Sequence, residues 1–176
     1  MRFLRLKVPA LFPMLISFFL VSAGCGSEEK EQHDPGTVFR YNESKGISTL
    51  DPAYARNQTI IWPVTQLFDG LVQLDDQLNV IPAIASSWTI SGDGRVYTFR
   101  LRDDVWFHQS EYFEDSSRKV VASDFVYSFN RIRDPGVASP GSWIFERVEE
   151  EPGFVAMDDS TLMIRLDQPF PPFLSI

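Results

Sequence analysis

The chain has 176 residues, a formal net charge of −8 and a hydrophobic fraction of 44%. This fraction excludes a disordered protein, and the length suits one domain or slightly more. An acidic chain without a basic run disfavours nucleic acid as a partner, because phosphate contacts need a basic face. With only two histidines and one cysteine, we expect no metal site, no cofactor and no intrachain disulfide.

Residues 1–24 have the pattern of a signal peptide, with three basic residues before a mostly apolar run over 8–21. This run is shorter than the roughly 20 residues that a membrane-spanning helix needs, but it suits the hydrophobic region of a signal. Small residues then precede Cys25, and the segment resembles a bacterial lipobox in which Ser22 replaces the usual aliphatic residue. We expect Cys25 to be lipidated and to become the mature N-terminus. The alternative is an ordinary buried thiol.

Residues 25–36 are polar and lack periodicity, so they are predicted to form a flexible tether. The folded part is predicted to begin near Thr37 with short elements. In chain order these are a strand over 38–41, a turn at 48–52, a helix over 59–69, a strand over 71–74 and a turn at 75–77. The helix is expected because apolar residues recur at a spacing near 3.6, and Gly70 is expected to end it.

A hairpin is the strongest local prediction in the sequence. Apolar and polar residues alternate on both sides of Asp93-Gly94, a dipeptide typical of hairpin turns. This phase places Ile90 opposite Tyr97 and Trp88 opposite Phe99, all on one face. A loop over residues 92–95 would keep the same pairing.

The second half is predicted to contain a helix and another hairpin. After a polar loop, Ser123 is expected to cap a helix with Phe125, Phe129 and Ile132 on one stripe. The segment 134–136 (Asp-Pro-Gly) should end this helix. Strands are then expected over 154–157 and 161–166, joined at 158–160.

The sequence lacks the common motifs of enzyme sites, including the nucleophile elbow and the phosphate-binding loop. Three aspartate pairs occur at 75–76, 103–104 and 158–159, each at a predicted turn or strand end, where aspartate satisfies backbone groups. His108 has no nucleophile or metal partner at a suitable spacing, so we interpret it as structural. No catalytic residue is therefore expected.

Several segments, taken together and in order, resemble the extracytoplasmic solute-binding proteins of family 5, the peptide- and nickel-type receptors of ABC importers. They are Leu50-Asp51-Pro52, Leu67-Phe68-Asp69-Gly70-Leu71, 82–88, Asp93-Gly94 with 97–102, 105–108, 122–128 with Arg131, and 159–162. The chain departs from the family by an insertion between His108 and Ala122 and by ending well before the family's usual length. We therefore interpret it as an N-terminal fragment.

The resemblance implies an α+β fold of the two-lobed α/β periplasmic-binding-protein type (class II), with a mixed sheet, hairpins and short helices. Only part of the first lobe and its inserted subdomain would be present. The implied organisation is a signal peptide over 1–24, a lipid-anchored linker over 25–36 and a partial solute-binding domain over 37–176, truncated at its C-terminus.

The resemblance also indicates where a ligand would bind. In peptide-binding members, one loop that contacts the ligand follows Leu-Asp-Pro, and another lies later in the first lobe. The matching candidates here are Arg56, Asn57, Gln58, Gly141, Ser142 and Trp143. The alternatives are a plain surface loop for the first three and core packing for Trp143.

The implied protein is a lipid-anchored receptor that captures oligopeptides outside the cytoplasmic membrane, on its periplasmic side or at the cell surface. It would deliver them to ABC permease subunits after closure of its lobes, and the full-length protein would act as a monomer. The same scaffold could instead bind a nickel chelate, haem or an oligosaccharide. An alternative of another class is a secreted, lipid-anchored hydrolase, which would need a nucleophile–base pair that the sequence does not show.

Overall fold

A computed structural model describes residues 40–175, and those from Glu43 onward belong to one compact unit. The signal peptide, Cys25 and the tether predicted from the sequence lie outside the described residues. Across residues 40–175, no helix combines the length and apolarity needed to cross a bilayer.

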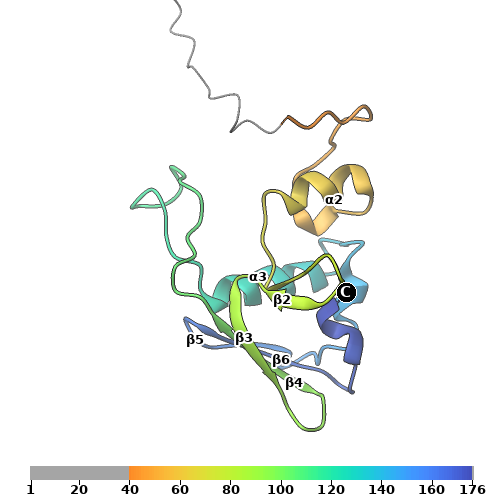
Figure 1. Cartoon of the computed structure of the whole chain (residues 1–176), viewed down its shortest axis with the longest axis vertical. Coiled ribbons are helices and arrows are strands. Elements are labelled where there is room, and N and C mark those ends of the chain that lie inside the picture. The colour runs from red at the N-terminus through yellow and green to blue at the C-terminus, as the bar shows by residue number, and fades with distance from the viewer. Residues whose placement is uncertain (1–39, 176) are drawn as a thin grey trace, which may run out of the picture. The chain divides into compact units, whose positions relative to one another are not determined.

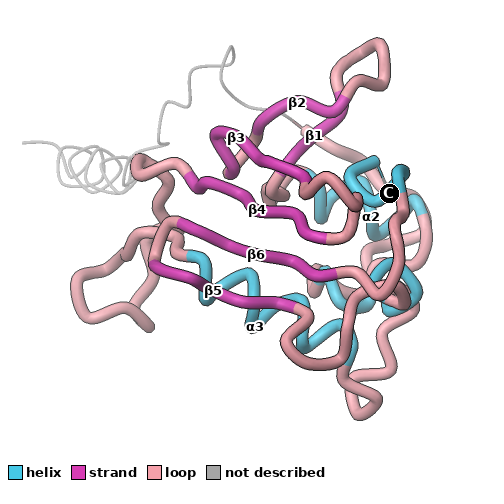
Figure 2. Tube along the Cα trace, turned by 90° about the horizontal axis from the view of Figure 1, so that it is seen from below, coloured by secondary structure: helices cyan, strands magenta, loops and turns pink. Residues whose placement is uncertain are grey.

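The centre of this unit is a four-stranded antiparallel sheet in the order β3-β4-β6-β5 (Figure 2). Its strands are β3 (Ala85–Ile90), β4 (Val96–Leu101), β5 (Phe154–Asp158) and β6 (Thr161–Arg165). The two sequence-predicted hairpins form its two halves, β3 with β4 and β5 with β6. Both hairpin predictions are therefore confirmed.

The register of the first hairpin is the predicted one, with Trp88 opposite Phe99 and Ile90 opposite Tyr97. The connection is the loop over residues 92–95, in which Gly94 adopts a φ of +70° that L side chains rarely reach. Tyr97 and Phe99 are buried, whereas Ile90 remains 47% exposed. This face of the hairpin is thus buried on β4 and more open on β3, which is an edge strand of the sheet.

Helix α3 (Ala122–Arg133) packs across β5 and β6 (Figures 1 and 2). The predicted stripe is confirmed, because Phe125 is buried and Phe129 and Ile132 pack against the core. The Phe129 ring lies 4.9 Å from that of Phe145 and 5.3 Å from that of Phe154, centroid to centroid. These aromatic contacts join the helix, the sheet and the segment after the helix.

The start of α3 differs from the prediction. Ser123 is exposed and lies inside the helix, so it does not cap it. Instead, the Asp124 carboxylate accepts a hydrogen bond from the backbone N–H of Val121, 2.9 Å away. The predicted end is confirmed, since Asp134 terminates the helix with extended backbone angles.

Helix α2 (Gln58–Thr65) is shorter than predicted. The expected stop at Gly70 is wrong, because the helix closes on Gln66 and leaves Leu67 and Phe68 half exposed. The apolar spacing in the sequence continues past the end of the helix, although these two side chains line a cavity and do not belong to the apolar face of α2.

The remaining elements are short. Strands β1 (Val72–Leu74) and β2 (Val80–Pro82) form a separate antiparallel pair, joined through the predicted turn at Asp75. Three 3₁₀ helices, η1 (Pro52–Tyr54), η2 (Ser142–Phe145) and η3 (Pro171–Ser175), complete the described chain. Of the strand expected over 38–41, residues 40 and 41 are not in a strand and the others lie outside the described part.

The insertion after His108 is held in place by Arg118. Its guanidinium lies 4.6 Å from the ring centroid of Phe107 and 5.5 Å from that of Phe113, and it is paired with the Asp124 carboxylate. Burial alone would raise the pKa of Asp124, but the hydrogen bonds from Arg118 and from the Val121 N–H keep it below the usual value. The insertion is thereby fastened to the first turn of α3.

Candidate ligand-binding site

The segment over residues 51–58, here called the Asp51 loop, is shaped by two capping side chains. Asp51 is extended before Pro52, as the residue before a proline prefers, and its carboxylate accepts a hydrogen bond from the Ala53 N–H at 3.0 Å. Asn57 is also extended, and its side-chain oxygen accepts from the Ile60 N–H at 3.2 Å. The loop backbone is therefore set by its own sequence at both ends.

Arg131, in the last turn of α3, lies 80 residues after Asp51 in the sequence. Its guanidinium donates two hydrogen bonds, of 2.9 and 2.6 Å, to the Asp51 carboxylate. The two side chains are 34% and 32% exposed, so water screens the pair only in part. The hydrogen bond from Arg131 lowers the pKa of Asp51, and Asp51 in turn raises the pKa of Arg131. This pair ties the Asp51 loop to the helix that anchors the core.

A second connection joins the Asp51 loop to residues 138–143, here called the Ser139 loop. Ser139 is buried, and its hydroxyl donates to the Ala53 carbonyl oxygen at 2.6 Å while accepting from the Gly141 N–H at 3.2 Å. Ala138 next to it has a φ of +50°, a left-handed conformation that is strained for alanine. The two loops that the sequence proposed for ligand contact thus lie side by side.

A cavity of about 330 Å³ opens between these two loops. It is lined by Ser48, Thr49, Tyr54, Arg56, Ile60, Ala138 and Pro140. Its polar groups are one guanidinium and three hydroxyls, which are suited to donating hydrogen bonds to oxygen atoms of a ligand.

The six candidate residues do not all occupy this cavity. Arg56 lines it, whereas Gly141, Ser142 and Trp143 follow Pro140 without lining it. The side chain of Asn57 is used as a helix cap, and Gln58 is exposed at the start of α2. Trp143 is 57% exposed, so the alternative of core packing is wrong for this residue.

Sequence reasoning missed the three hydroxyl residues of the cavity and the part played by Arg131 and Ser139. Arg131 belonged to a recognised segment, and so did Asp51, but nothing in one sequence shows that the two side chains meet. Ser139 stood in a loop rich in small residues, where a buried hydroxyl leaves no pattern. Only a packed structure reveals such contacts.

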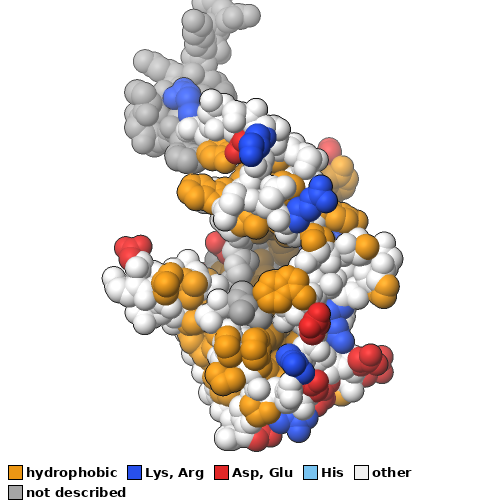
Figure 3. Space-filling view, turned by 90° about the vertical axis from the view of Figure 1, so that its right-hand side faces the viewer, with side chains coloured by type: hydrophobic (Ala, Val, Ile, Leu, Met, Phe, Trp, Pro, Cys, Tyr) orange, Lys and Arg blue, Asp and Glu red, His pale blue; other side chains and the backbone are white. Residues whose placement is uncertain are grey.

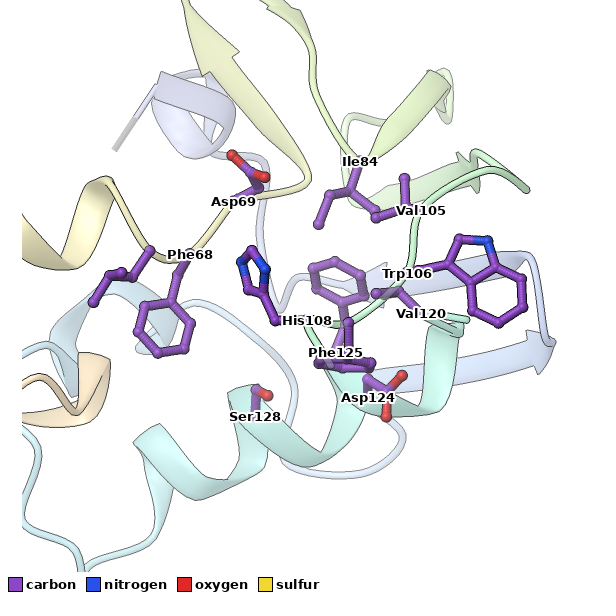
Figure 4. A pocket seen from close by; sticks show the side chains of 12 residues that line it. Phe68, Asp69, Ile84, Val105, Trp106, His108, Val120, Asp124, Phe125 and Ser128 are labelled. Carbon is purple, nitrogen blue, oxygen red and sulfur yellow. The ribbon is translucent and has the colours of Figure 1, made fainter. Parts of the chain in front are cut away.

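A second cavity, of about 240 Å³, lies between residues 67–69, residues 105–108 and α3 (Figure 4). Its walls are mostly apolar, including Phe68 and Trp106, and its Asp124 is already paired with Arg118. His108, interpreted as structural, lies on its wall. Figure 3 shows several hydrophobic side chains exposed on one side of the described residues. This cavity resembles packing surface more than a site for a polar ligand.

Known proteins match this chain in sequence and in structure. Residues 79–176 match the family model described as bacterial extracellular solute-binding proteins, family 5 Middle. The periplasmic murein peptide-binding protein MppA of Escherichia coli is 32% identical over 143 residues, which is 73% of this chain and 25% of MppA.

Two solved structures extend this likeness. The substrate-binding domain of an oligopeptide ABC transporter from Bacillus anthracis has a TM-score of 0.67 and 32% identity, over 77% of this chain and 27% of that one. NikZ from Campylobacter jejuni, solved in complex with Ni(L-His), has a TM-score of 0.60 and 31% identity, over 73% of this chain and 24% of NikZ.

The chain therefore spans about a quarter of the length of the relatives it matches. The fold class expected from the sequence is confirmed: the chain is part of a two-lobed periplasmic-binding-protein fold with sheets and few helices. Both sheets of the described residues are antiparallel. Because the family model covers more than half of it, the chain belongs to the bacterial extracellular solute-binding proteins of family 5.

Proposed function

We propose that this chain is part of the substrate-binding component of an ABC importer and captures oligopeptides outside the cytoplasmic membrane. The observation that carries the proposal is the joining of the Asp51 loop to the Ser139 loop through Arg131 and Ser139. Membership of the family and the peptide-binding name of the relative MppA support the ligand class.

Capture would proceed by closure of two lobes around the peptide, a hinge motion without covalent chemistry. The peptide main chain would be held by strand-like hydrogen bonds, with water-filled pockets that tolerate varied side chains. The proposed contacts are Arg56, Asn57, Gln58, Gly141, Ser142 and Trp143. Because the Asn57 side chain caps α2, this residue would contact the ligand through its backbone, as Gly141 would.

A nickel chelate is the second candidate ligand, favoured by the likeness to NikZ. Within the described residues, no group of three or more His, Cys, Asp or Glu side chains could hold a metal ion. On this alternative, the loops would contact the organic part of the chelate. Haem and oligosaccharides remain further alternatives for the scaffold, without a feature of these loops that favours them.

A hydrolase is disfavoured because the family consists of solute-binding receptors. The polar residues of the cavity, Ser48, Thr49, Tyr54 and Arg56, include no histidine or carboxylate that could activate a hydroxyl as a nucleophile. These polar residues are therefore suited to binding a ligand rather than to catalysis.

The proposed location is extracytoplasmic, with the mature protein anchored to a membrane through lipidated Cys25 and carried on the tether over 25–36. The intact protein would act as a monomer and present its cargo to the permease subunits. Radiolabelled palmitate should be incorporated into the wild type and not into Cys25→Ser. Equal labelling of both would contradict the anchor.

The peptide ligand is tested on the protein as its own cells produce it. Native mass spectrometry of the protein purified without denaturant should show bound species of several masses, and acid release should yield short peptides of mixed sequence. Release of nickel with a small chelator, or of a sugar, would support an alternative instead. Turnover of a substrate without a stable ligand would contradict the proposal.

A further inference from the structure

The cavity between the Asp51 loop and the Ser139 loop has one charged group, the guanidinium of Arg56. The hydroxyls of Ser48, Thr49 and Tyr54 accompany it, and no carboxylate belongs to the lining. Thr49 accepts a hydrogen bond from the Asp51 N–H at 3.1 Å, which leaves its own hydroxyl hydrogen free to donate. The cavity therefore offers donors around a single positive charge.

Arg56 is not neutralised by its surroundings. Within residues 40–175 it forms no hydrogen bond or ion pair, although the chain carries a net charge of −8. Asp51, the carboxylate of the same loop, is occupied by Arg131 through both of its oxygens. Four other arginines in the described part are paired with acids: Arg95, Arg102, Arg118 and Arg131. Arg56 is thus an exposed cation at the cavity, without a hydrogen-bond or ion-pair partner among the described residues.

Two residues of the wall around Arg56 are restrained by packing or by backbone conformation. Ile60, 3% exposed, belongs to α2 directly after the loop, and Ala138 on the opposite wall is held in its strained conformation beside buried Ser139. Restrained walls reduce the ordering cost of binding. A guanidinium also matches a carboxylate with two parallel hydrogen bonds, which a neutral group cannot reproduce.

We infer that Arg56 determines specificity at this site by binding a carboxylate of the captured peptide. The inference rests on the proposed peptide-binding function and narrows its ligand class to peptides with a carboxylate at this end of the site. That carboxylate is either the peptide's C-terminus or an acidic side chain, and the two sources share the same chemistry.

The test uses the protein as its own cells produce it, stripped of ligand and offered one synthetic pool of short peptides. The pool pairs each free-acid peptide with its C-terminal amide, and each Glu-containing peptide with its Gln counterpart. Captured peptides are quantified by mass spectrometry for the wild type, Arg56→Gln and Arg56→Lys. Arg100→Gln is the matched control, because Arg100 lies on the sheet and donates to Thr161 at 3.0 Å. Melting curves verify that each variant is folded.

We expect the wild type and Arg100→Gln to enrich one carboxylate class about tenfold or more over its neutral counterpart, as a charge-assisted hydrogen-bonded pair supports. Preference for acid over amide identifies the C-terminus, and preference for Glu over Gln identifies a side chain. Arg56→Gln should lose the preference while still capturing peptides, and Arg56→Lys should keep part of it. Unchanged preference in folded Arg56→Gln, or no preference in the wild type, would overturn the inference about Arg56 and leave the proposed peptide-binding function standing. Capture of no peptide by the wild type would refute the proposed function, and the inference with it.

Discussion

The ionised carboxylate of Asp51 holds the Asp51 loop to α3 through Arg131. The hydrogen bond from Arg131 lowers its folded-state pKa below the ordinary value of 3.8. A lowered folded pKa means that the carboxylate contributes stability above its unfolded pKa and loses this contribution as the pH falls through the folded pKa. Wild type should therefore exceed Asp51→Asn in unfolding free energy at neutral pH, with the gap narrowing below about pH 4. Denaturant unfolding at several pH values measures this gap, and a gap independent of pH would contradict the pairing.

Ser139 provides a second prediction at the same scale. Ser139→Ala leaves the Ala53 carbonyl and the Gly141 N–H without this buried partner. Such a loss should destabilise the protein by about 1–2 kcal/mol in denaturant unfolding. Ser123→Ala is the matched control, because exposed Ser123 makes no capping bond, and its effect should stay within about 0.5 kcal/mol. Equal effects of the two variants would show that the Ser139 contact is unimportant.

These residues also show why sequence reasoning stops short of the site. The extended backbone of Asp51 follows from local sequence, because Pro52 restricts the residue before it. The partnership with Arg131 spans 80 residues and depends on the packing of α3, which no local pattern encodes. Residue type predicts Ser123 as the cap of α3, whereas the Asp124 carboxylate is the group that accepts the hydrogen bond from the Val121 N–H.

At the scale of elements, the Ser139 loop depends on the packing of α3. Phe129 contacts Phe145, which lies in η2 just past the end of this loop, and Phe154 on β5. Phe129→Ala should cost about 3 kcal/mol in unfolding free energy, because it leaves a cavity among aromatic rings. Tyr127→Ala, on the same helix but 72% exposed, is the control and should cost far less. Similar losses for both variants would refute the structural importance of this ring cluster.

Elements with strong periodicity were the predictable part of the fold. The alternation in the first hairpin specified its register, because a shift by one residue would turn every core side chain outward. The helix predicted over 59–69 is too long, because Leu67 and Phe68 continue the apolar spacing although they lie outside α2. Apolar spacing alone cannot separate a helical stripe from a loop that lines a cavity.

At the scale of the whole molecule, the ordered set of short segments was enough to predict the family and the fold class. The ligand was not predictable to the same depth. The described chain spans about a quarter of its relatives, and known relatives include both a peptide-binding protein and a structure with a nickel chelate. Relatives with one scaffold thus carry different ligands, and we propose that side chains such as Arg56 make the difference.

The central claim is that the Asp51 loop and the Ser139 loop face the peptide. Hydrogen–deuterium exchange of the protein as its own cells produce it, with and without the peptides recovered from it, tests this claim most directly. We predict slower exchange on peptide addition over residues 53–58 and 138–143, with no change in the hairpin turn over 92–95. Peptide binding that protects other segments and leaves both loops unchanged would contradict the account.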